Sequence, residues 1–179
     1  MLFRSPVLSS KIGERGVRDP YICRSPEGDT FYLIATDLSV YVSFSNDLLE
    51  WREEETLLYM GHESWEDEKL GASCPPVKTD KGWLLLYHGV SSKDKAYRVG
   101  AMLLDLNDPR KILGRTKDFL MEPEYPFETK GFYSGCVFPT GIVEVKDEYY
   151  IYYGAGDQCI CLATVNKDAL LKELLGGKK

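Results

Sequence analysis

Hydrophobic residues along this chain occur in short runs, and residues typical of turns separate these runs. The clearest run lies at residues 82–89, where apolar and aromatic side chains between two glycines end in His88. So short a run is typical of a strand buried on both faces, although periodicity alone does not exclude a helix segment. Cys74-Pro75-Pro76 precedes the run and prevents a helix from entering it. We therefore predict a strand that presents His88 at its end, next to a loop.

The same alternation of short runs and turn clusters continues over most of the chain. It predicts further strands at residues 20–24, 31–36, 40–45, 98–104, 141–145, 149–153 and 159–165. The acidic run at 53–55 indicates a solvated loop or a sheet edge. Asn166 suits the N-cap of one final helix at 167–175, whose leucines share a face and which two glycines end. The fold class is all-β with a short C-terminal helix.

An all-β chain must dispose of its sheet edges. It can close a barrel, stack two sheets in a sandwich or arrange blades radially, and the strand pattern does not separate a sandwich from propeller blades. With 179 residues the chain allows one domain, over residues 1–179, that is large enough for a hydrophobic core without disulfides.

Composition narrows the partners and the compartment. A formal net charge of -6, with no long basic run, argues against a nucleic-acid surface and requires any phosphate site to be a local basic pocket. The five cysteines form no CxxC pair, which is typical of buried reduced thiols and favours the cytoplasm. We expect no signal peptide and no contact with a membrane, because the N-terminus lacks an apolar segment and no stretch approaches a membrane span.

Motifs for several other chemistries are missing. The two histidines form no HExxH pattern and no zinc-ligand spacing with the cysteines, so we expect no metal. The chain also has no GxSxG elbow, no GxxxxGKS loop and no GxGxxG turn, so serine hydrolase, nucleotide triphosphatase and dinucleotide-binding functions lack support.

Three residues could converge at one end of the strand over residues 82–89. Lys69 lies in a segment before this strand, His88 at its end, and Tyr97 after a short polar loop. Together they offer the donors that a tightly held oxyanion needs. Taken singly, each has an ordinary structural explanation, as a surface lysine, a satisfied histidine and a half-buried tyrosine.

Several short motifs around these residues occur in an order that resembles a known family. They are Lys69-Leu70-Gly71-Ala72 with Pro75-Pro76, Gly82-Trp83-Leu84, Tyr87-His88-Gly89-Val90, Tyr97-Arg98-Val99-Gly100-Ala101, Asp108-Pro109, Gly114-Arg115, Val137-Phe138-Pro139 and Tyr152-Tyr153-Gly154-Ala155. Over residues 44–166 the chain is similar to the C-terminal half of glycoside hydrolase family 130, the β-mannoside phosphorylases.

The resemblance implies a five-bladed β-propeller that cleaves β-mannosides with inorganic phosphate and inversion, with an oligosaccharide as the second substrate and no metal or organic cofactor. It assigns phosphate binding to Lys69, His88 and Tyr97. It makes Asp19 the proton donor, places Glu128 near the reaction centre, and gives Asp157 contacts with sugar hydroxyls. An aspartate before a proline and an aspartate in a tight turn also occur for purely structural reasons.

The N-terminal segment departs from this pattern. Residues 16–38 resemble glycoside hydrolase family 43 most, and Arg18 stands where family 130 has a glutamate. Four strands per blade would give the chain about three blades, two fewer than the family's five. We therefore expect an open arc with uncovered flanks, which should self-associate. Two other functions therefore remain open: a family 43-like hydrolase in which a carboxylate activates water, and an inactive carbohydrate-binding or structural remnant.

Overall fold

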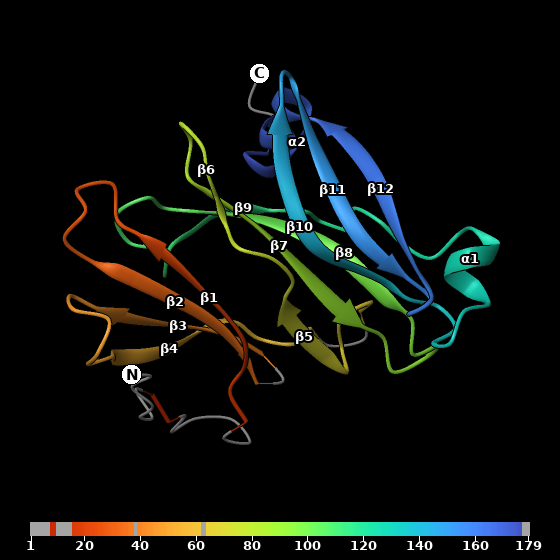
Figure 1. The fold of residues 1–179 in the computed structure, drawn as a ribbon, viewed down its shortest axis with the longest axis horizontal. Helices are drawn as coiled ribbons and strands as arrows, with labels where there is room; N and C mark the ends of the chain where they lie inside the picture. Colours follow the sequence, from red (N-terminus) through yellow and green to blue (C-terminus); the bar gives the residue numbers. More distant parts are fainter. Residues whose placement is uncertain (1–7, 10–15, 38, 62–63, 177–179) are drawn as a thin grey trace, which may run out of the picture.

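The structure is a computed structural model that describes residues 8–9, 16–37, 39–61 and 64–176. The described residues form three antiparallel β-sheets and two short helices. The sheets follow one another across the molecule in chain order, with the second sheet between the other two (Figure 1).

The first sheet has four strands in sequence order. They are β1 (Arg18–Arg24), β2 (Phe31–Asp37), β3 (Ser39–Ser45) and β4 (Arg52–Leu58). The hydroxyl oxygen of Ser25 closes the β1–β2 turn, because it accepts hydrogen bonds from three successive backbone N–H groups, of residues 28 to 30. The register of β1 against β2 shifts between Arg18 and Tyr21, a stretch that contains Pro20, which has no N–H to donate to the ladder.

The middle sheet contains the strand predicted most clearly from the sequence. Its members are β5 (Lys69–Ala72), β6 (Val77–Lys78), β7 (Trp83–Val90), β8 (Tyr97–Leu104) and β9 (Ile112–Arg115). The order is β5-β7-β8-β9, and β6 also pairs with β7. Every residue of β7 is buried, as expected for a strand that is covered on both faces.

The third sheet and the helices complete the fold. The strands are β10 (Val137–Val145), β11 (Glu148–Ala155) and β12 (Cys159–Asn166), and the helices are α1 (Pro126–Thr129) and α2 (Lys167–Leu174). The side chain of Asn166 caps α2 by accepting a hydrogen bond of 3.0 Å from the N–H of Ala169. Three leucines of α2 are buried against the sheets.

The middle sheet separates two hydrophobic cores. Because neighbouring residues of a strand point to opposite faces, alternate residues of β7 enter different cores. Leu85 and Tyr87 pack toward the first sheet, together with Ile34 and Val42. The second core combines residues of β7 and β8 with residues of the third sheet and of α2, among them Leu84, Leu86, Ala101, Leu103, Tyr149, Ile151, Leu170 and Leu174.

The all-β class and the short final helix are confirmed. Each predicted strand has an observed counterpart, and the observed α2 ends one residue before the predicted helix. The acidic run at 53–55 lies in β4, an edge strand of the first sheet. The short β5, β6 and β9 and the one-turn helix α1 were not predicted. Among the described residues, no helix is long and apolar enough to cross a membrane.

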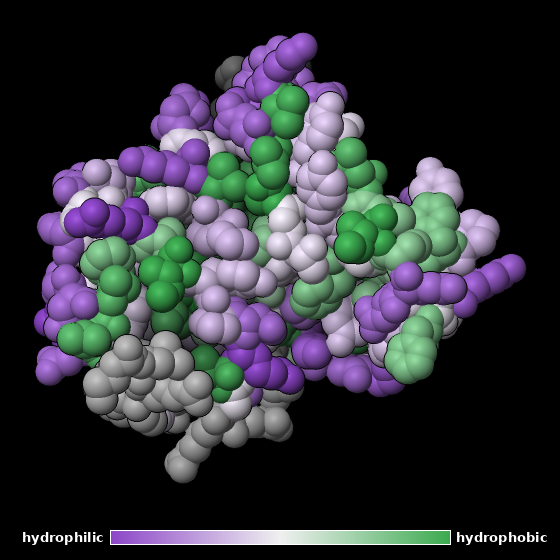
Figure 2. All heavy atoms as spheres, in the orientation of Figure 1, coloured by the Kyte–Doolittle hydropathy of each residue, from purple (hydrophilic) through white to green (hydrophobic). Residues whose placement is uncertain are grey.

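The outer face of the third sheet carries exposed apolar residues. Ile160 is 82% exposed, and Leu162, Tyr152 and Val143 are also exposed on the same three strands. Figure 2 views this face and shows apolar surface beside polar surface over these strands. Soluble monomers rarely expose apolar residues in contiguous patches, so this face is a candidate contact surface.

Candidate functional site

Lys69, His88 and Tyr97 lie on one face at one end of the middle sheet. Lys69 and Tyr97 are each paired with Val90 in the neighbouring strand, and His88 is two residues before Val90. Residues that are paired, or separated by two along a strand, point to the same face. The three side chains therefore share the face that lies toward the third sheet, so the structure brings together the three residues that the sequence grouped.

The lysine and the tyrosine form a direct pair. Lys69 Nζ donates a hydrogen bond of 3.0 Å to Tyr97 Oη and lies 5.3 Å from the centroid of the tyrosine ring. Lys69 is half-buried, and among the described residues no carboxylate lies within ion-pair distance of it. A half-buried ammonium group without a carboxylate partner is a favourable place for an anion.

His88 is buried behind this pair. Its Nδ1 lies 3.2 Å from the hydroxyl of Ser73, and its ring centroid lies 5.5 Å from that of Tyr97. Burial lowers the pKa of His88 to about 3, and the nearby charges of Lys69 and Arg18 act in the same direction. The imidazole is therefore neutral at neutral pH and contributes one N–H at most, so the positive charge of this site must come from other residues.

Gly71 makes room for this histidine. The two residues are paired across β5 and β7, and a Cβ atom at position 71 would lie 2.4 Å from Cε1 of His88. The methyl group of Thr36 would be 3.0 Å from the same Cβ atom. Only a residue without a side chain fits there, because real Cβ atoms do not approach so closely.

Arg18 is the cation that sequence reasoning missed. Arg18 is paired with Thr36 in the β1–β2 ladder. Thr36 contacts β5 in two ways: its methyl group lies close to Gly71, and its Oγ1 accepts a hydrogen bond from the N–H of Ala72. Arg18 is exposed, and it has no ion-pair partner among the described residues. In the sequence, Arg18 stood out only because family 130 has a glutamate at this position. Its place directly before Asp19 was the one sign that it lies near the site.

Asp157 faces the same hollow as Tyr97. A depression of about 250 Å³ is lined by Tyr97, Tyr133, Cys136, Phe138 and Asp157. The Sγ atom of Cys136 lies 4.0 Å from Oδ1 of Asp157. Burial raises the pKa of the Cys136 thiol to about 12; the charge of Asp157 acts in the same direction and that of Lys69 opposes it. The exposed carboxylate of Asp157, in a turn with a φ of 52°, is therefore available to a ligand in the hollow.

Asp19, the residue after Arg18, has an unusual backbone conformation. Its φ of 49° is unusual for a residue with a side chain, and such strain is often found at functional sites. Burial raises the pKa of the neighbouring Tyr21, and the negative charge of Asp19 adds to the effect. Tyr21 Oη donates a hydrogen bond of 2.8 Å to the carbonyl of Ser73, the residue whose hydroxyl contacts His88.

Glu128 is held in a different way. Its side chain is buried, and Oε2 accepts hydrogen bonds of 2.7 and 2.9 Å from the N–H groups of Glu124 and Tyr125, which form part of the capping of α1. Oε1 accepts a third bond, of 2.8 Å, from the hydroxyl of Tyr153. The backbone carbonyl of Glu128 also accepts the N–H of Cys136. The three side-chain bonds therefore occupy the carboxylate of Glu128, and its backbone carbonyl is linked to Cys136, which lines the hollow.

Comparisons with solved structures first define the class of protein. The fold superposes on the beta-1,2-mannobiose phosphorylase from Listeria innocua with a TM-score of 0.81 and 30% sequence identity, covering 88% of this chain and 46% of that one. The chain therefore has the fold of a carbohydrate-active enzyme. A family model then makes the assignment specific. The model of glycoside hydrolase family 130, described as beta-1,4-mannooligosaccharide phosphorylase, matches residues 18–175, and the chain belongs to this family.

Curated relatives give the same result over parts of the chain. A beta-1,2-mannobiose phosphorylase of Thermoanaerobacter sp. is 47% identical over 105 residues, which are 59% of this chain and 34% of the relative. A beta-1,4-mannooligosaccharide phosphorylase of Ruminococcus albus is 31% identical over 159 residues, or 86% of this chain and 46% of the relative. The chain spans less than half the length of these relatives. The narrower likeness of residues 16–38 to family 43 stays a prediction.

Proposed function

We propose that this chain takes part in the phosphorolysis of β-mannosides and carries the phosphate-binding part of that active site. The observation that supports the proposal best is the Lys69–Tyr97 pair, whose ammonium group has no carboxylate partner among the described residues. Phosphate would accept hydrogen bonds from Lys69 Nζ, from Tyr97 Oη and from the ring of neutral His88. Arg18 would supply a second positive charge.

The chemistry follows from this placement of cations. A phosphate oxygen attacks the anomeric carbon of the mannosyl residue, and the bond from that carbon to the glycosidic oxygen breaks with inversion. The leaving oxygen takes a proton, which Asp19 would donate, directly or through a sugar hydroxyl. Asp157 would hold hydroxyl groups of the sugar in the hollow. For Glu128 the observed hydrogen bonds favour a positioning role over direct contact with the substrate.

The arrangement of sheets suggests how the site is framed. Three successive antiparallel sheets, of which the middle one is covered on both faces, suit three neighbouring blades of a five-bladed propeller. The similarity to a solved family member, 46% of whose chain is covered, supports this arrangement. Self-association through the exposed apolar face of the third sheet would be one source of further blades. All five cysteines are free thiols, which suits a cytoplasmic protein.

A sugar-release assay tests the proposal. The chain is incubated with β-1,2- and β-1,4-mannobiose, with and without inorganic phosphate, and mannose 1-phosphate and free mannose are measured. Phosphorolysis predicts mannose 1-phosphate only when phosphate is present. Lys69→Ala should raise the phosphate concentration needed for half-maximal rate by about tenfold or more, because a charge-assisted hydrogen bond is worth roughly 1.5–3 kcal/mol. The exposed lysine of the same sheet, in Lys78→Ala, serves as the matched control.

A second function, as an inactive binding or structural unit, is favoured by one observation. The chain spans less than half the length of the two curated relatives described above. In that case neither mannobiose is cleaved, but phosphate still binds and Lys69→Ala still weakens its binding. Release of mannose without phosphate would instead identify a hydrolase. Loss of neither binding nor activity in Lys69→Ala would contradict the proposed phosphate site.

A further inference from the structure

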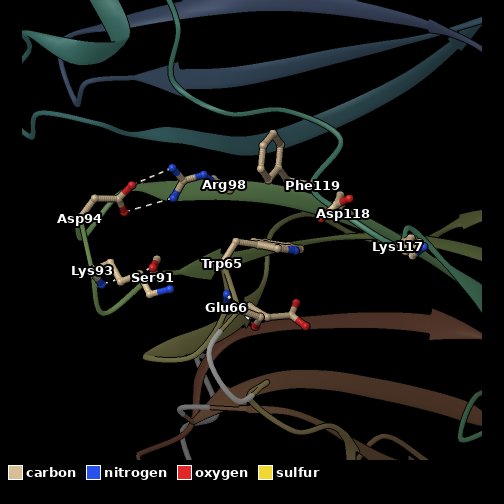
Figure 3. A pocket seen from close by; sticks show the side chains of 10 residues that line it. Trp65, Glu66, Ser91, Lys93, Asp94, Arg98, Lys117, Asp118 and Phe119 are labelled. Atoms are coloured by element: carbon tan, nitrogen blue, oxygen red, sulfur yellow. Dashed lines mark hydrogen bonds and ion pairs between the residues drawn. The ribbon is translucent and has the colours of Figure 1, made fainter.

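A second cleft opens on the other face of the middle sheet. It lies between residues 64–66, the β7–β8 turn and residues 117–119 after β9, and its volume is about 510 Å³, within the range of small-molecule sites (Figure 3). Arg98, which lines this cleft, pairs with Gly89, whereas Tyr97 pairs with Val90. Since successive residues point to opposite faces, the sheet separates the cleft from the Lys69–Tyr97 pair.

Two aromatic side chains form fixed walls of this cleft. Trp65 is stacked on buried Tyr87, with ring centroids 5.7 Å apart and an interplanar angle of 28°. Phe119 meets Trp65 edge to face at 6.3 Å and 87°. Both residues are half-buried, so each stays partly accessible in the cleft, and the guanidinium of Arg98 lies over the ring of Phe119, 5.5 Å from its centroid.

Polar groups in the cleft are also held in place. The guanidinium of Arg98 forms two parallel hydrogen bonds with the carboxylate of Asp94, of 3.1 and 2.7 Å, which Figure 3 shows at one side of the cleft. Its Nε donates a third bond, of 3.2 Å, to Glu122. Hydrogen bonds from Arg98 lower the pKa of Asp94 to about 2, so the carboxylate is ionised at neutral pH. Donors and acceptors therefore lie side by side with fixed directions.

The charges that line the cleft balance. Lys93, Arg98 and Lys117 are matched by three carboxylates, those of Glu66, Asp94 and Asp118. Two further charged residues lie just outside the lining: Arg115 pairs with Glu66, and Glu122 pairs with Arg98. Because one is positive and the other negative, the net charge around the cleft stays zero. A charged ligand would gain nothing from such a lining and would compete with its ion pairs. A neutral ligand that offers hydroxyl groups and apolar C–H faces would match it.

We propose that this cleft is a saccharide-binding site, separate from the phosphate site on the other face of the sheet. Aromatic walls would contact the C–H faces of a sugar ring, and the fixed guanidinium and carboxylate would bind its hydroxyl groups. The inference does not depend on phosphorolysis by this chain, because it rests on the lining of the cleft alone. Such a site would hold a second part of a long glycan, or a separate glycan, while the other face carries out its own function.

Titration of the full chain with β-1,4-mannotriose tests the inference, with amide chemical shifts as the measurement. The amides of residues 91–94 and 117–119 should shift together and give one dissociation constant. Phe119→Ala should weaken binding by about tenfold, the equivalent of losing one aromatic contact. Phe127→Ala removes an exposed phenylalanine outside the cleft and should leave the constant unchanged. Lys69→Ala should also leave it unchanged, which separates this test from that of the proposed function.

The charge argument has its own test, which does not depend on the stability of Phe119→Ala. Mannose 6-phosphate should bind at the cleft more weakly than mannose in the native chain. Asp118→Asn removes one exposed carboxylate of the lining and should strengthen mannose 6-phosphate binding roughly two- to fivefold. The inference is wrong if a large excess of mannotriose leaves the amide chemical shifts around the cleft unchanged. It is also wrong if mannose 6-phosphate binds the native cleft more tightly than mannose does.

Discussion

The close contact between Gly71 and His88 makes Gly71→Ala a sensitive test of the site. The added Cβ would lie 2.4 Å from Cε1 and 2.6 Å from Nε2 of a ring that is 1% exposed and packed on several sides. The third neighbour, the methyl group of Thr36, would be 3.0 Å away. Neither side can yield without moving a buried group, so the substitution should act as overpacking and cost about 1–3 kcal/mol of unfolding free energy.

Urea denaturation, followed by tryptophan fluorescence, measures this cost. Gly141→Ala is the matched control, because it also adds one methyl group in a strand, but no described atom lies within 4 Å of its Cβ. The control should be neutral or should gain up to about 1 kcal/mol, since alanine lowers the entropy of the unfolded chain. Surface substitutions usually change the unfolding free energy by less than about 0.5 kcal/mol. A loss this small for Gly71→Ala would refute the close contact between position 71 and His88.

A double-mutant cycle identifies the partner in this contact. When His88→Ala has removed the ring, Gly71→Ala should cost less, with a coupling energy in the range of about 0.5–3 kcal/mol that is typical of residues in contact. Thr36 remains close in both backgrounds, so a small residual cost is expected. If the cost of Gly71→Ala is the same in both backgrounds, the strain lies in the backbone and His88 is not the cause.

Three further outcomes follow from the structure. The folded pKa of His88 is about 3, below its usual 6.5, so its contribution to stability is complete above pH 6.5 and is lost as the pH falls toward 3. The unfolding free energy of the native chain, measured by urea denaturation, should therefore fall in this window by up to about 1.4 kcal/mol per pH unit more than that of His88→Gln. Glu128→Gln should lower stability by about 1–3 kcal/mol without changing phosphate affinity, because the amide oxygen accepts the two N–H groups more weakly than the carboxylate does and the new NH2 group meets the Tyr153 hydroxyl; unchanged stability with lost turnover would instead place Glu128 in the chemistry. If the outer face of the third sheet mediates self-association, sedimentation should show that Ile160→Lys shifts the chain toward monomer, and an unchanged distribution would exclude this face.

The sequence predicted well those features that depend on neighbouring strands or on a few successive residues. Lys69, His88 and Tyr97 belong to consecutive paired strands, so the register of one hairpin and its neighbour is enough to bring them together. The strand over residues 83–90 was recognisable because it is buried on both faces and therefore apolar throughout. The N-cap of α2 was recognisable for a similar reason, since its chemistry depends on Asn166 and the next three residues alone.

Other features depend on contacts between distant segments. Glu128 looked like one more loop glutamate, because its partner Tyr153 is 25 residues away. Its helix is a single turn that begins with Pro126, too short for any hydrophobic period to appear. The edge strand β9 has two exposed residues and two half-buried ones, so it lacks the apolar alternation that marks a strand. The approach of Arg18 to His88 depends on the pairing of β1 with β2 and on the packing of the first sheet against the second.

The burial of β7 on both faces also determines how the molecule opens. An amide in an edge strand such as β12 can exchange its hydrogen after one strand separates, whereas an amide in β7 is reached only after both neighbouring sheets have moved away. Exchange from β7 should therefore follow the global unfolding reaction and be the slowest in the chain. The end of this strand carries His88, and its neighbours in the ladder carry Lys69 and Tyr97. The anion-binding residues are thus anchored to the last part of the protein to unfold, so a proteolytic fragment or a partly denatured sample that keeps the middle sheet and its two covering layers should keep their geometry.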